Sequence, residues 1–412
     1  MNNGYLAALL RGLCVDLAGK PHFVIAGPGG KIPAGAMAVD LPPEQNAAAP
    51  PPEKTAEIIR SAYNAWKAET GIAPEAGRVL LPSCAAIHAG GSAGGATALF
   101  WTGGSFDSAR KRLAEGDASP QIESVAITAA AVLPEERAAV VKNRIAVVTG
   151  GAQGIGEEIS RSLAAAGALV FIADLNLEGA EKLAGEINAA EKRTAALAVK
   201  VNVADEASVE AMFAAIAETA GGLDLCVSNA GVLKAGSVLE QEIADFKFVT
   251  DINYTGFFVV SKFAGRLLKA QHYGAPRWKT DIIQINSKSG LEGSNKNGAY
   301  AGGKFGGIGL AASFAMELVE YNIKVNAVCP GNFLDGPLWS HPEKGLFVQY
   351  LRAGKVPGAK SAADVRAFYE SKVPMKRGCT GKDLVRAIYY IVEQEYETGQ
   401  AVPVTGGQVM LH

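Results

Sequence analysis

The feature that most constrains the fold of this chain is a regular alternation of apolar runs and helical patterns from about residue 142 to the end. This alternation is the sequence form of a parallel sheet flanked by helices. Seven apolar runs predict an α/β domain over residues 143–412, built on a doubly wound, seven-stranded parallel sheet. The predicted strands are Arg144–Thr149, Ala168–Ala173, Thr194–Val201, Leu223–Val227, Asp281–Asn286, Lys324–Val328 and Ala401–Val404.

The first 142 residues differ in composition from the rest of the chain, because they are rich in Ala, Gly and Pro. The run Ala47–Pro52 predicts an extended linker or the start of a helix. Helical spacing of apolar residues predicts a helix over Glu53–Thr70, and Ser105 is a plausible N-cap for a helix that ends near Leu113. Strand-like runs stand at Arg78–Leu81, Ala96–Trp101 and Ile122–Ala129. We therefore expect a small accessory α/β region over residues 1–142, with no function that its residues indicate.

Composition excludes several classes of function. The 412 residues include 39 Lys and Arg against 41 Asp and Glu, so a net charge of −2 gives no basic field for a nucleic acid or an anionic membrane. The apolar run Tyr5–Leu10 is too short for a signal sequence or a membrane span. The five cysteines form no CxxC pair and the five histidines are scattered. These features predict a cytoplasmic protein without a metal site.

A glycine-rich turn joins the first predicted strand to a helix. Gly150, Gly154 and Gly156 form a G-x-x-x-G-x-G pattern that also contains Gln153 and Ile155. Such glycines let backbone N–H groups approach a pyrophosphate, and the helix N-terminus adds its partial positive charge. A glycine-rich surface turn would look similar. The position between a strand and a helix favours a dinucleotide site of the Rossmann type.

An acidic residue ends the second predicted strand. Asp174 stands where a carboxylate can accept hydrogen bonds from the ribose hydroxyls of a bound adenosine. The 2′-phosphate of NADP would place negative charge beside this carboxylate, and neither Leu175 nor Asn176 supplies a cation. The pattern therefore favours NAD, with the alternative that Asp174 only begins a turn.

A tyrosine and a lysine one helical turn apart suit acid–base chemistry. Tyr300 and Lys304 open a long predicted helix and share one of its faces. A nearby ammonium lowers the pKa of a phenol, which makes the phenol a better proton acceptor near neutral pH. Ser287 follows a predicted strand at the sheet edge where ligands collect in open α/β sheets. Its hydroxyl can hold a substrate oxygen.

Together with Ser228-Asn229-Ala230-Gly231, Asn253 and Pro330-Gly331, these motifs resemble those of the short-chain dehydrogenase/reductase family. They occur in the family's order, and the resemblance covers about residues 143–412. It implies an oxidoreductase in which Tyr300 is the general acid/base, and Lys304 binds the ribose and lowers the pKa of Tyr300. Ser287 orients the substrate oxygen, and Asn253 supports a water relay. These four are the implied catalytic residues.

The resemblance also implies where the cofactor binds. Three positions depart from the family pattern: Ser228 replaces the first Asn of an Asn pair, Asn202 replaces an acid, and Asn332 stands where many relatives have a threonine. The amide of Asn202 can contact adenine nearly as well as an acid. The implied cofactor-binding residues are Gly150, Gln153, Gly154, Ile155, Gly156, Asp174, Asn202, Val203, Asn229, Ala230, Gly231, Tyr300, Lys304, Pro330, Gly331 and Asn332.

Longer stretches, including Ile282–Gly290 and Val404–Met410, are similar to a branch of the family that interconverts polyol phosphates and ketose phosphates with NAD. That branch implies sorbitol 6-phosphate and fructose 6-phosphate as the substrate pair. Lys288 is the first candidate to bind the phosphate. The alternative is a surface lysine paired with Glu292 or another acid. Two further candidates lie on loops expected to face the same cleft, Lys234 and Asn297.

Other interpretations stay open at this point. The substrate could be an unphosphorylated polyol or another secondary alcohol, and the chain could be a scaffold or regulatory protein that retains a dehydrogenase fold. The long insertion past Pro330-Gly331, which reaches to about Lys372, suits either a lid that excludes water or a helix that contacts another subunit. The family resemblance implies a homodimer or a homotetramer.

Overall fold

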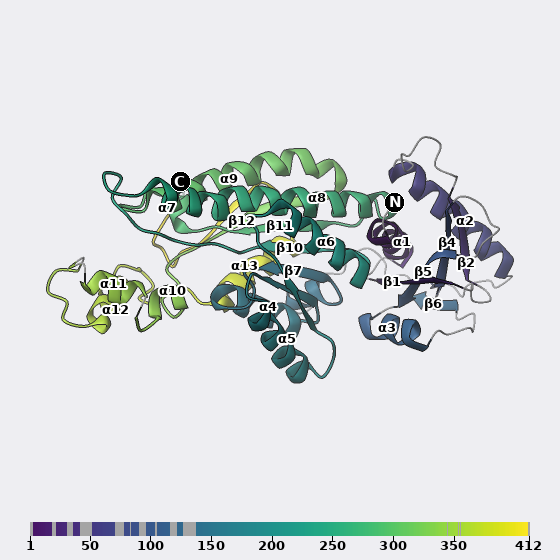
Figure 1. Ribbon diagram of the computed structural model, residues 1–412, viewed down its shortest axis with the longest axis horizontal. Helices are drawn as coiled ribbons and strands as arrows, with labels where there is room; N and C mark the ends of the chain where they lie inside the picture. Colours follow the sequence, from purple (N-terminus) through teal and green to yellow (C-terminus); the bar gives the residue numbers. More distant parts are fainter. Residues whose placement is uncertain are drawn as a thin grey trace.

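The computed structural model places helices on both faces of one large sheet, with a smaller sheet at one end (Figure 1). None of the helices in the described part of the chain is long and apolar enough to cross a membrane. The described residues are 3–18, 22–30, 36–41, 52–70, 78–82, 84–89, 96–103, 105–115, 122–126, 137–343, 345–352, 354 and 356–410.

The large sheet is entirely parallel, with strand order β13-β12-β11-β10-β7-β8-β9. This confirms the predicted doubly wound, seven-stranded sheet of Rossmann type. The order reverses at β7, so the carboxyl ends of β7 and β10 flank the crevice in which such sheets bind ligands. The strands are β7 (Ile145–Thr149), β8 (Leu169–Asp174), β9 (Ala196–Lys200), β10 (Leu225–Ser228), β11 (Thr280–Ile285), β12 (Ile323–Pro330) and β13 (Ala401–Val404).

Two hydrophobic clusters cover the two faces of this sheet, because strand side chains alternate in direction. Ile145 and Val147 of β7 pack with α6 (Glu206–Ala220), α8 (Gly256–Gly274) and α9 (Gly298–Leu318). Ala146 and Val148 pack on the other face with α4 (Gly154–Ala165), α5 (Leu177–Glu191) and α13 (Gly381–Glu393). The shorter elements are η1 (Arg137–Val141), α7 (Ile243–Thr250), the π-helical η2 (Asp251–Thr255), η3 (Lys288–Gly290) and η4 (Val319–Tyr321).

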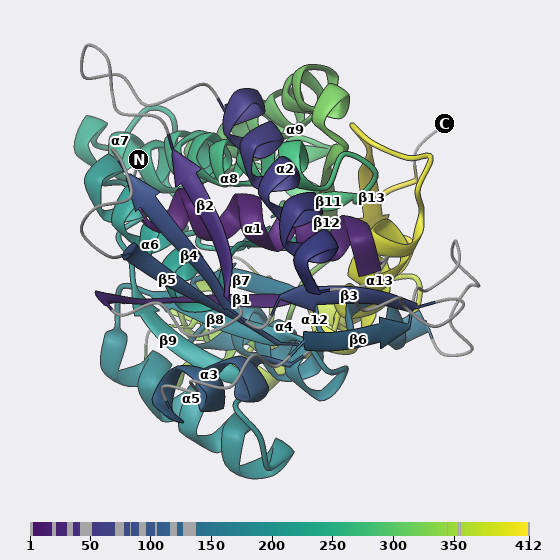
Figure 2. The ribbon, with the colours of Figure 1, turned by 90° about the vertical axis from the view of Figure 1, so that its right-hand side faces the viewer.

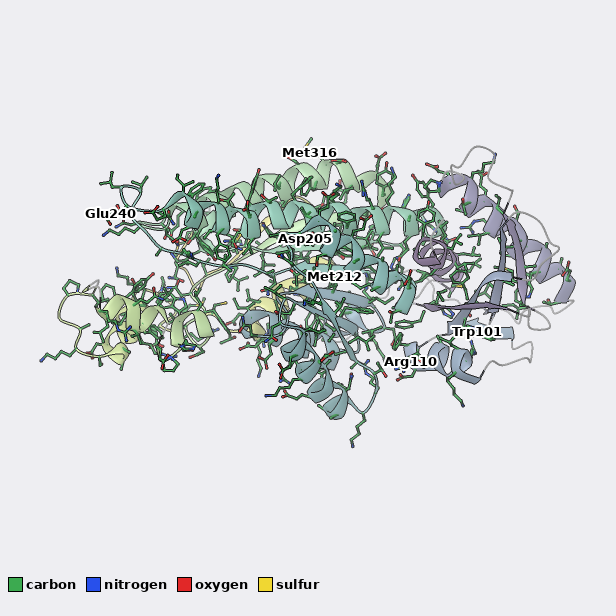
Figure 3. All side chains as sticks on the ribbon, in the orientation of Figure 1. Trp101, Arg110, Asp205, Met212, Glu240 and Met316 are labelled. Atoms are coloured by element: carbon green, nitrogen blue, oxygen red, sulfur yellow. The ribbon has the colours of Figure 1, made fainter. Side chains whose placement is uncertain are left out.

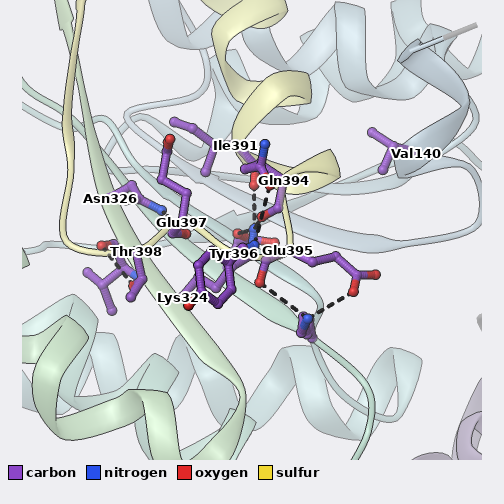
Figure 4. A network of polar contacts seen from close by, with 12 residues as sticks. Val140, Lys324, Asn326, Ile391, Gln394, Glu395, Tyr396, Glu397 and Thr398 are labelled. Atoms are coloured by element: carbon purple, nitrogen blue, oxygen red, sulfur yellow. Dashed lines mark hydrogen bonds and ion pairs between the residues drawn. The ribbon is translucent and has the colours of Figure 1, made fainter. Parts of the chain in front are cut away.

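A cation at the amino end of β12 ties the sheet to the end of α13 (Figure 4). Lys324 forms an ion pair with Asp281 at 3.0 Å and donates to the carbonyls of Ile391 and Gln394. Cations near a helix C-terminus satisfy carbonyls that have no partner within the helix. Asn326 in the same network accepts from the backbone of Gln400 at 2.9 Å, which fixes the turn before β13.

The N-terminal region is an α/β unit with a mixed sheet of order β1-β5-β4-β2 and a separate pair, β3-β6. The predicted helix over Glu53–Thr70 and three of the predicted strands are present. Residues 47–51 of the predicted linker and residues 127–129 of the last predicted strand lie outside the described residues. The elements are α1 (Asn3–Ala18), β1 (Phe23–Gly30), β2 (Met37–Leu41), α2 (Pro52–Thr70), β3 (Arg78–Pro82), β4 (Cys84–Ala89), β5 (Ala96–Gly103), α3 (Phe106–Glu115) and β6 (Ile122–Ala126).

The sequence did not predict α1, β1, β2 or β4. Nearly every side chain of α1 from Leu6 to Val15 is buried, so this helix lacks the polar face that reveals a surface helix. Strand β1 contains Gly27, Pro28 and two more glycines, residues that ordinarily indicate a turn. The partner strand β5 determines the conformation of this segment through antiparallel pairing.

Helix α1 joins the N-terminal unit to the large domain, because it contacts α6 and α8 as well as β1 and α2 (Figure 1). Figure 2 shows α2 and the small sheet from the end that faces away from the large domain. Gly12 of α1 and Gly274 of α8 meet so closely that a Cβ on Gly12 would stand 2.5 Å from the Gln271 carbonyl oxygen. Phe23 and Phe106 share one hydrophobic cluster with Phe213 of α6. The hydrophobic core therefore continues from the N-terminal unit into the large domain.

A small helical insertion lies at the opposite end of the molecule from the N-terminal unit (Figure 1). It contains α10 (Pro337–Ser340), α11 (Leu346–Arg352) and α12 (Ala362–Ser371). Trp339 packs against Phe347 and Tyr369, with ring centroids 5.3 Å and 4.9 Å away. Leu233, which follows β10, packs on the same cluster. The insertion thus has its own core and rests against a loop at the carboxyl edge of the sheet.

Candidate active site

The glycine turn after β7 can bring backbone N–H groups close to an anion. Gly150 and Gly154 have φ angles of 60° and 57°, values that favour glycine. A Cβ on Gly156 would stand 2.1 Å from the Gly150 carbonyl oxygen, so only glycine fits there. Gln153 is exposed at the N-terminus of α4 and forms no side-chain cap, and Ile155 is half-buried beside it. This cradle suits a pyrophosphate.

The turn is fastened to the neighbouring strand β10. Asn229 donates from Nδ2 to the carbonyl oxygens of Thr149 at 2.9 Å and Gly150 at 3.0 Å. The Thr149 hydroxyl in return accepts from the backbone N–H groups of Asn229 and Ala230. Gly231 follows, and a Cβ there would stand 3.2 Å from Oδ1 of Asn253. These contacts hold the two strand ends that flank the crevice.

Asp174 braces the same turn. One carboxylate oxygen accepts from Ala152 N–H at 3.0 Å and the other from Asn176 N–H at 2.9 Å. The side chain is 9% exposed at the carboxyl end of β8. Because a carboxylate oxygen can accept more than one hydrogen bond, Asp174 can also accept from ribose hydroxyls. The turn interpretation and the ribose interpretation of this residue are therefore compatible.

The remaining positions expected to contact the cofactor lie along the carboxyl edge. Asn202 is exposed and folds back on Ala204 N–H at 3.1 Å, and Val203 is buried beside it. Pro330 is the last residue of β12, and Gly331 after it donates its N–H to the Val404 carbonyl oxygen at 2.9 Å. Asn332 donates its N–H to Gln408 Oε1 at 3.1 Å. The sequence did not single out Gln408, since its contact depends on how the C-terminal segment folds back.

Ser287, Tyr300 and Lys304 meet at the carboxyl end of β11. The Ser287 hydroxyl lies near enough to Tyr300 to lower the pKa of its phenol through hydrogen bonding, and Lys304 Nζ lies 5.6 Å from the centroid of the Tyr300 ring. Lys304 is 4% exposed and donates to the Ile285 carbonyl oxygen at 2.8 Å. Three groups that can hold a proton and a substrate oxygen therefore lie together. The turn of α9 brings Tyr300 near Lys304, and the end of β11 brings Ser287 to them.

Burial governs the pKa values at this position. It raises the pKa of Tyr300 above its ordinary value, and the hydrogen bond with Ser287 opposes that rise. Burial lowers the pKa of Lys304 to about 8. We expected the ammonium to lower the pKa of the phenol, whereas burial decides the direction of the shift in the protein without ligands.

Asn253 lies in the π-helical segment η2, ahead of α8. Its Oδ1 accepts from Val232 N–H and its Nδ2 donates to the Val232 carbonyl oxygen, both at 2.8 Å. A π-helical turn often marks a functional site because it redirects a side chain within a helix. Here it directs Asn253 onto the loop after β10, where this side chain holds one wall of the crevice.

The three residues proposed to bind substrate have local partners or lie between loops. Lys288 forms an ion pair with Glu292 at 2.9 Å, which is the alternative that the sequence left open. Lys234 forms an ion pair with Asp245. Asn297 precedes α9, and its backbone bridges to Gly236, so it joins the loop after β10 to the helix of Tyr300. Its Oδ1 is buried without a hydrogen-bond partner in the structure.

Comparisons with known proteins agree with this geometry. Residues 144–341 match the family model of the short chain dehydrogenases. The chain is 36% identical over 271 residues to sorbitol-6-phosphate 2-dehydrogenase of Escherichia coli (strain K12), an alignment that covers 65% of this chain and 99% of that protein. It is 31% identical to galactitol 2-dehydrogenase of Agrobacterium fabrum (strain C58 / ATCC 33970) over 65% of this chain and 98% of that protein.

A solved structure extends the comparison to the fold. The crystal structure of sorbitol-6-phosphate 2-dehydrogenase from Erwinia amylovora matches with a TM-score of 0.60 and 39% sequence identity, over 65% of this chain and 100% of that one. The N-terminal unit lies outside the family-model match. By the family model, the length of the alignments and the motifs in place around the crevice, the chain belongs to the short-chain dehydrogenase family and is an NAD(P)-dependent oxidoreductase that acts on CH–OH groups.

Proposed function

We propose that this protein is an NAD-dependent dehydrogenase that interconverts a polyol phosphate and a ketose phosphate, with sorbitol 6-phosphate and fructose 6-phosphate as the pair. The observation that carries the proposal is the meeting of Ser287, Tyr300 and Lys304 at the same carboxyl edge of the sheet as the glycine turn. The similarity over nearly the full length of a sorbitol-6-phosphate 2-dehydrogenase supports the choice of substrate.

The chain's own residues divide the work of proton transfer. The glycine turn and Asp174 would hold NAD, whose nicotinamide would supply the acceptor for the hydride that leaves the substrate carbon. Ser287 holds the substrate oxygen, and Tyr300 removes its proton during oxidation and returns it during reduction. The positive charge of Lys304 favours the phenolate form of Tyr300 during this transfer. Asn253 keeps the adjoining loop in place through Val232.

The preference for NAD over NADP rests on Asp174. This buried carboxylate would repel a 2′-phosphate, and its oxygens accept from backbone N–H groups of the turn. Lys200 stands opposite Asp174 in the sheet register, but its side chain is exposed. An exposed lysine offsets a buried carboxylate only weakly, so the balance favours the unphosphorylated ribose.

One observation favours a second candidate substrate, an unphosphorylated polyol or another secondary alcohol. The two lysines expected at the phosphate, Lys288 and Lys234, both have carboxylate partners. A phosphate would have to compete with Glu292 and Asp245 for these cations. The relative named galactitol 2-dehydrogenase supports the same candidate.

Parallel assays of NADH formation separate the two candidates. The full-length protein is given sorbitol 6-phosphate or sorbitol, each with NAD or NADP. Turnover of the phosphate with NAD alone supports the first candidate, and turnover of sorbitol alone supports the second. If Lys288 binds the phosphate, Lys288→Ala raises the KM for sorbitol 6-phosphate about tenfold or more. Lys382→Ala, at an exposed lysine of α13, is the matched control.

The scaffold alternative makes a different prediction. Tyr300→Phe removes the hydroxyl that transfers the proton and keeps the ring packing. We expect this change to abolish the biological role of a dehydrogenase, whereas a scaffold would keep its role in cells that express the variant.

We also propose that the chain assembles as a homodimer or homotetramer through the outer face of α8 and α9. Phe258, Phe305 and Met316 are 45%, 48% and 83% exposed there, and Met316 points away from the molecule (Figure 3). Large apolar side chains gathered on one face are typical of an interface. Light scattering of the wild type and of Phe258→Glu tests this proposal, since a charge at a subunit contact should yield monomers.

A further inference from the structure

Two buried amide side chains lie directly behind the catalytic residues. Gln284 belongs to β11, and Asn286 stands between that strand and Ser287; each is 2% exposed. Burying an amide costs free energy unless its polar atoms find partners. Apolar side chains would fill the same space without that cost. The contacts of these amides therefore indicate what they do.

Asn286 connects the two chain segments that carry the catalytic groups. Its Oδ1 accepts from the backbone N–H of Ser287 at 2.8 Å. Its Nδ2 donates to the carbonyl oxygen of Lys304 at 2.9 Å, within α9. One amide thus holds the strand end of Ser287 against the helical turn that begins with Tyr300.

Gln284 fixes the direction of the Asn286 amide. Its Oε1 accepts the other Nδ2 hydrogen of Asn286 at 2.7 Å, so both amide hydrogens of Asn286 are used. An inverted Asn286 would place its oxygen beside two other oxygens. The inverted orientation is therefore disfavoured, and Oδ1 remains directed at Ser287.

Two glycines make room for this pair. A Cβ on Gly290 of η3 would stand 2.2 Å from Asn286 Oδ1. A Cβ on Gly307 of α9 would stand 2.4 Å from Gln284 Nε2. Side chains at either position would force the strand end and the helix apart, so the close approach and the buried amides depend on each other.

We propose that Asn286, oriented by Gln284, is a positioning residue that sets the separation between Ser287 and the helical turn of Tyr300 and Lys304. The inference rests on the proposed roles of those three residues in proton transfer. Hydrogen-bond catalysis is sensitive to small displacements, and a shift of about 1 Å can reduce a rate about 100-fold. Asn286 touches neither the reacting atoms nor the cofactor site, and it acts through the residues that do.

Two variants and a control test this role. Asn286→Ala removes the hydrogen bonds to Ser287 and to the carbonyl of Lys304. Gln284→Met keeps Asn286 but removes the acceptor that fixes the direction of its amide. Asn326→Ala removes another fully buried asparagine, on the neighbouring strand β12, whose hydrogen bonds go to Glu397 and Gln400 before β13 and not to Ser287 or α9 (Figure 4). For each protein we would measure kcat and KM with sorbitol 6-phosphate, NADH binding by fluorescence, and unfolding by urea.

A readout that needs no substrate keeps this test separate from the proposed function. Tyrosines labelled with 13C at Cζ report phenol ionisation by NMR, and Tyr300→Phe identifies the Tyr300 signal. The groups facing Tyr300 are Ser287 from the strand end, Lys304 from α9 and Cys329 from β12. The hydrogen bond from Ser287 lowers the pKa of Tyr300, so loosening it should raise that pKa.

The positioning role predicts a consistent set of changes. Asn286→Ala should lower kcat about 10-fold to about 100-fold with NADH binding unchanged, and should move the Tyr300 titration to higher pH. Gln284→Met should do the same to a smaller degree, and it decides the question if Asn286→Ala does not fold. Asn326→Ala should lower stability without moving the titration. Folded Asn286 and Gln284 variants with an unchanged Tyr300 titration would overturn the proposal.

Discussion

Several polar side chains at this site act on the backbone first. Asn229 and Asp174 hold the glycine turn, and Asn253 holds the loop after β10. Each makes two hydrogen bonds to main-chain groups, which need partners where they are buried. The groups expected to contact ligand, Ser287 and Tyr300, depend on this framework for their separation. Some single substitutions therefore remove a group that takes part in the reaction. Others remove a hydrogen bond that holds such a group in position.

Replacing Asp174 should change the choice of cofactor. In Asp174→Ala the repulsion of a 2′-phosphate is removed together with the ribose hydrogen bonds, so we expect kcat/KM for NAD to fall about 10-fold or more and the ratio of NAD to NADP use to approach one. Kinetics with both cofactors measure the effect. Asp205→Ala, at the N-cap of α6, is a control outside the turn. A variant that still rejects NADP would show that another residue decides this preference.

Cofactor affinity should depend on the charge of Lys304. Burial lowers the pKa of this amine to about 8. A basic group with a lowered pKa is charged below that pKa and neutral above it, so we expect NADH to bind more weakly as the pH rises through about 8. Fluorescence titrations of NADH across this range give the profile. Lys304→Met should bind weakly at every pH, and a profile that survives this change would assign the dependence to another group.

At the scale of elements, the crossing of α1 and α8 is the main tertiary contact of the N-terminal unit. Arg11 of α1 forms a two-pronged ion pair with Asp224, at 3.2 Å and 2.8 Å, and both side chains are fully buried. Asp224 precedes β10 and also accepts from Ile145 N–H and from Trp278 Nε1. The carboxylate therefore connects α1, β7 and the loop before β11, and its loss would leave several donors without an acceptor.

This contact predicts how stability depends on pH. Burial opposes ionisation of Asp224, but the charges of Arg11 and Arg144 and the hydrogen bonds outweigh it, so the pKa lies below its ordinary value. A carboxylate with a lowered pKa stabilises the fold above its unfolded pKa of about 4, and this stability is lost as the pH falls through the folded pKa. Urea unfolding of the wild type should show this loss at acid pH.

Asp224→Asn should change that profile. The variant should be about 3 to 5 kcal/mol less stable at neutral pH, because Arg11 is left buried without its counter-charge. It should also lose less stability than the wild type on acidification. An acid profile identical to that of the wild type would assign the acid sensitivity to other carboxylates, such as Asp383 beside Arg377.

At the scale of the whole molecule, the N-terminal unit and the catalytic edge lie at opposite ends of the large sheet (Figure 1). Arg11 contacts the residue that precedes β10, whereas Ser287 and the glycine turn follow their strands. The unit is therefore placed to stabilise the domain, and those of its residues that the structure describes lie away from the crevice.

Deletion of residues 1–136 tests this assignment. It should uncover the surface of α6 and α8 that α1 covers, and lower the melting temperature by about 10 °C or more. The KM values of any protein that remains folded should stay unchanged. A truncated protein with full thermal stability and an altered KM would instead connect the unit to catalysis.

Local patterns in the sequence were enough to predict the parallel sheet, the glycine turn and the spacing of Tyr300 and Lys304. These features depend on local rules: apolar periodicity, the φ angles that favour glycine, and the geometry of one helical turn. Local rules could not predict α1 or β1, because burial on all sides removes the polar face of a helix and pairing with β5 overrides glycine and proline.

The partners of distant groups, in contrast, depend on the folded chain. Packing brought Lys234 to Asp245 and Arg11 to Asp224, and it placed Asn286 between Ser287 and the carbonyl of Lys304. It also reversed the expected direction of the Tyr300 pKa shift, since burial depends on everything that packs around the phenol. Sequence spacing defines which side chains share a turn or a face, whereas contact across elements depends on how the whole chain packs.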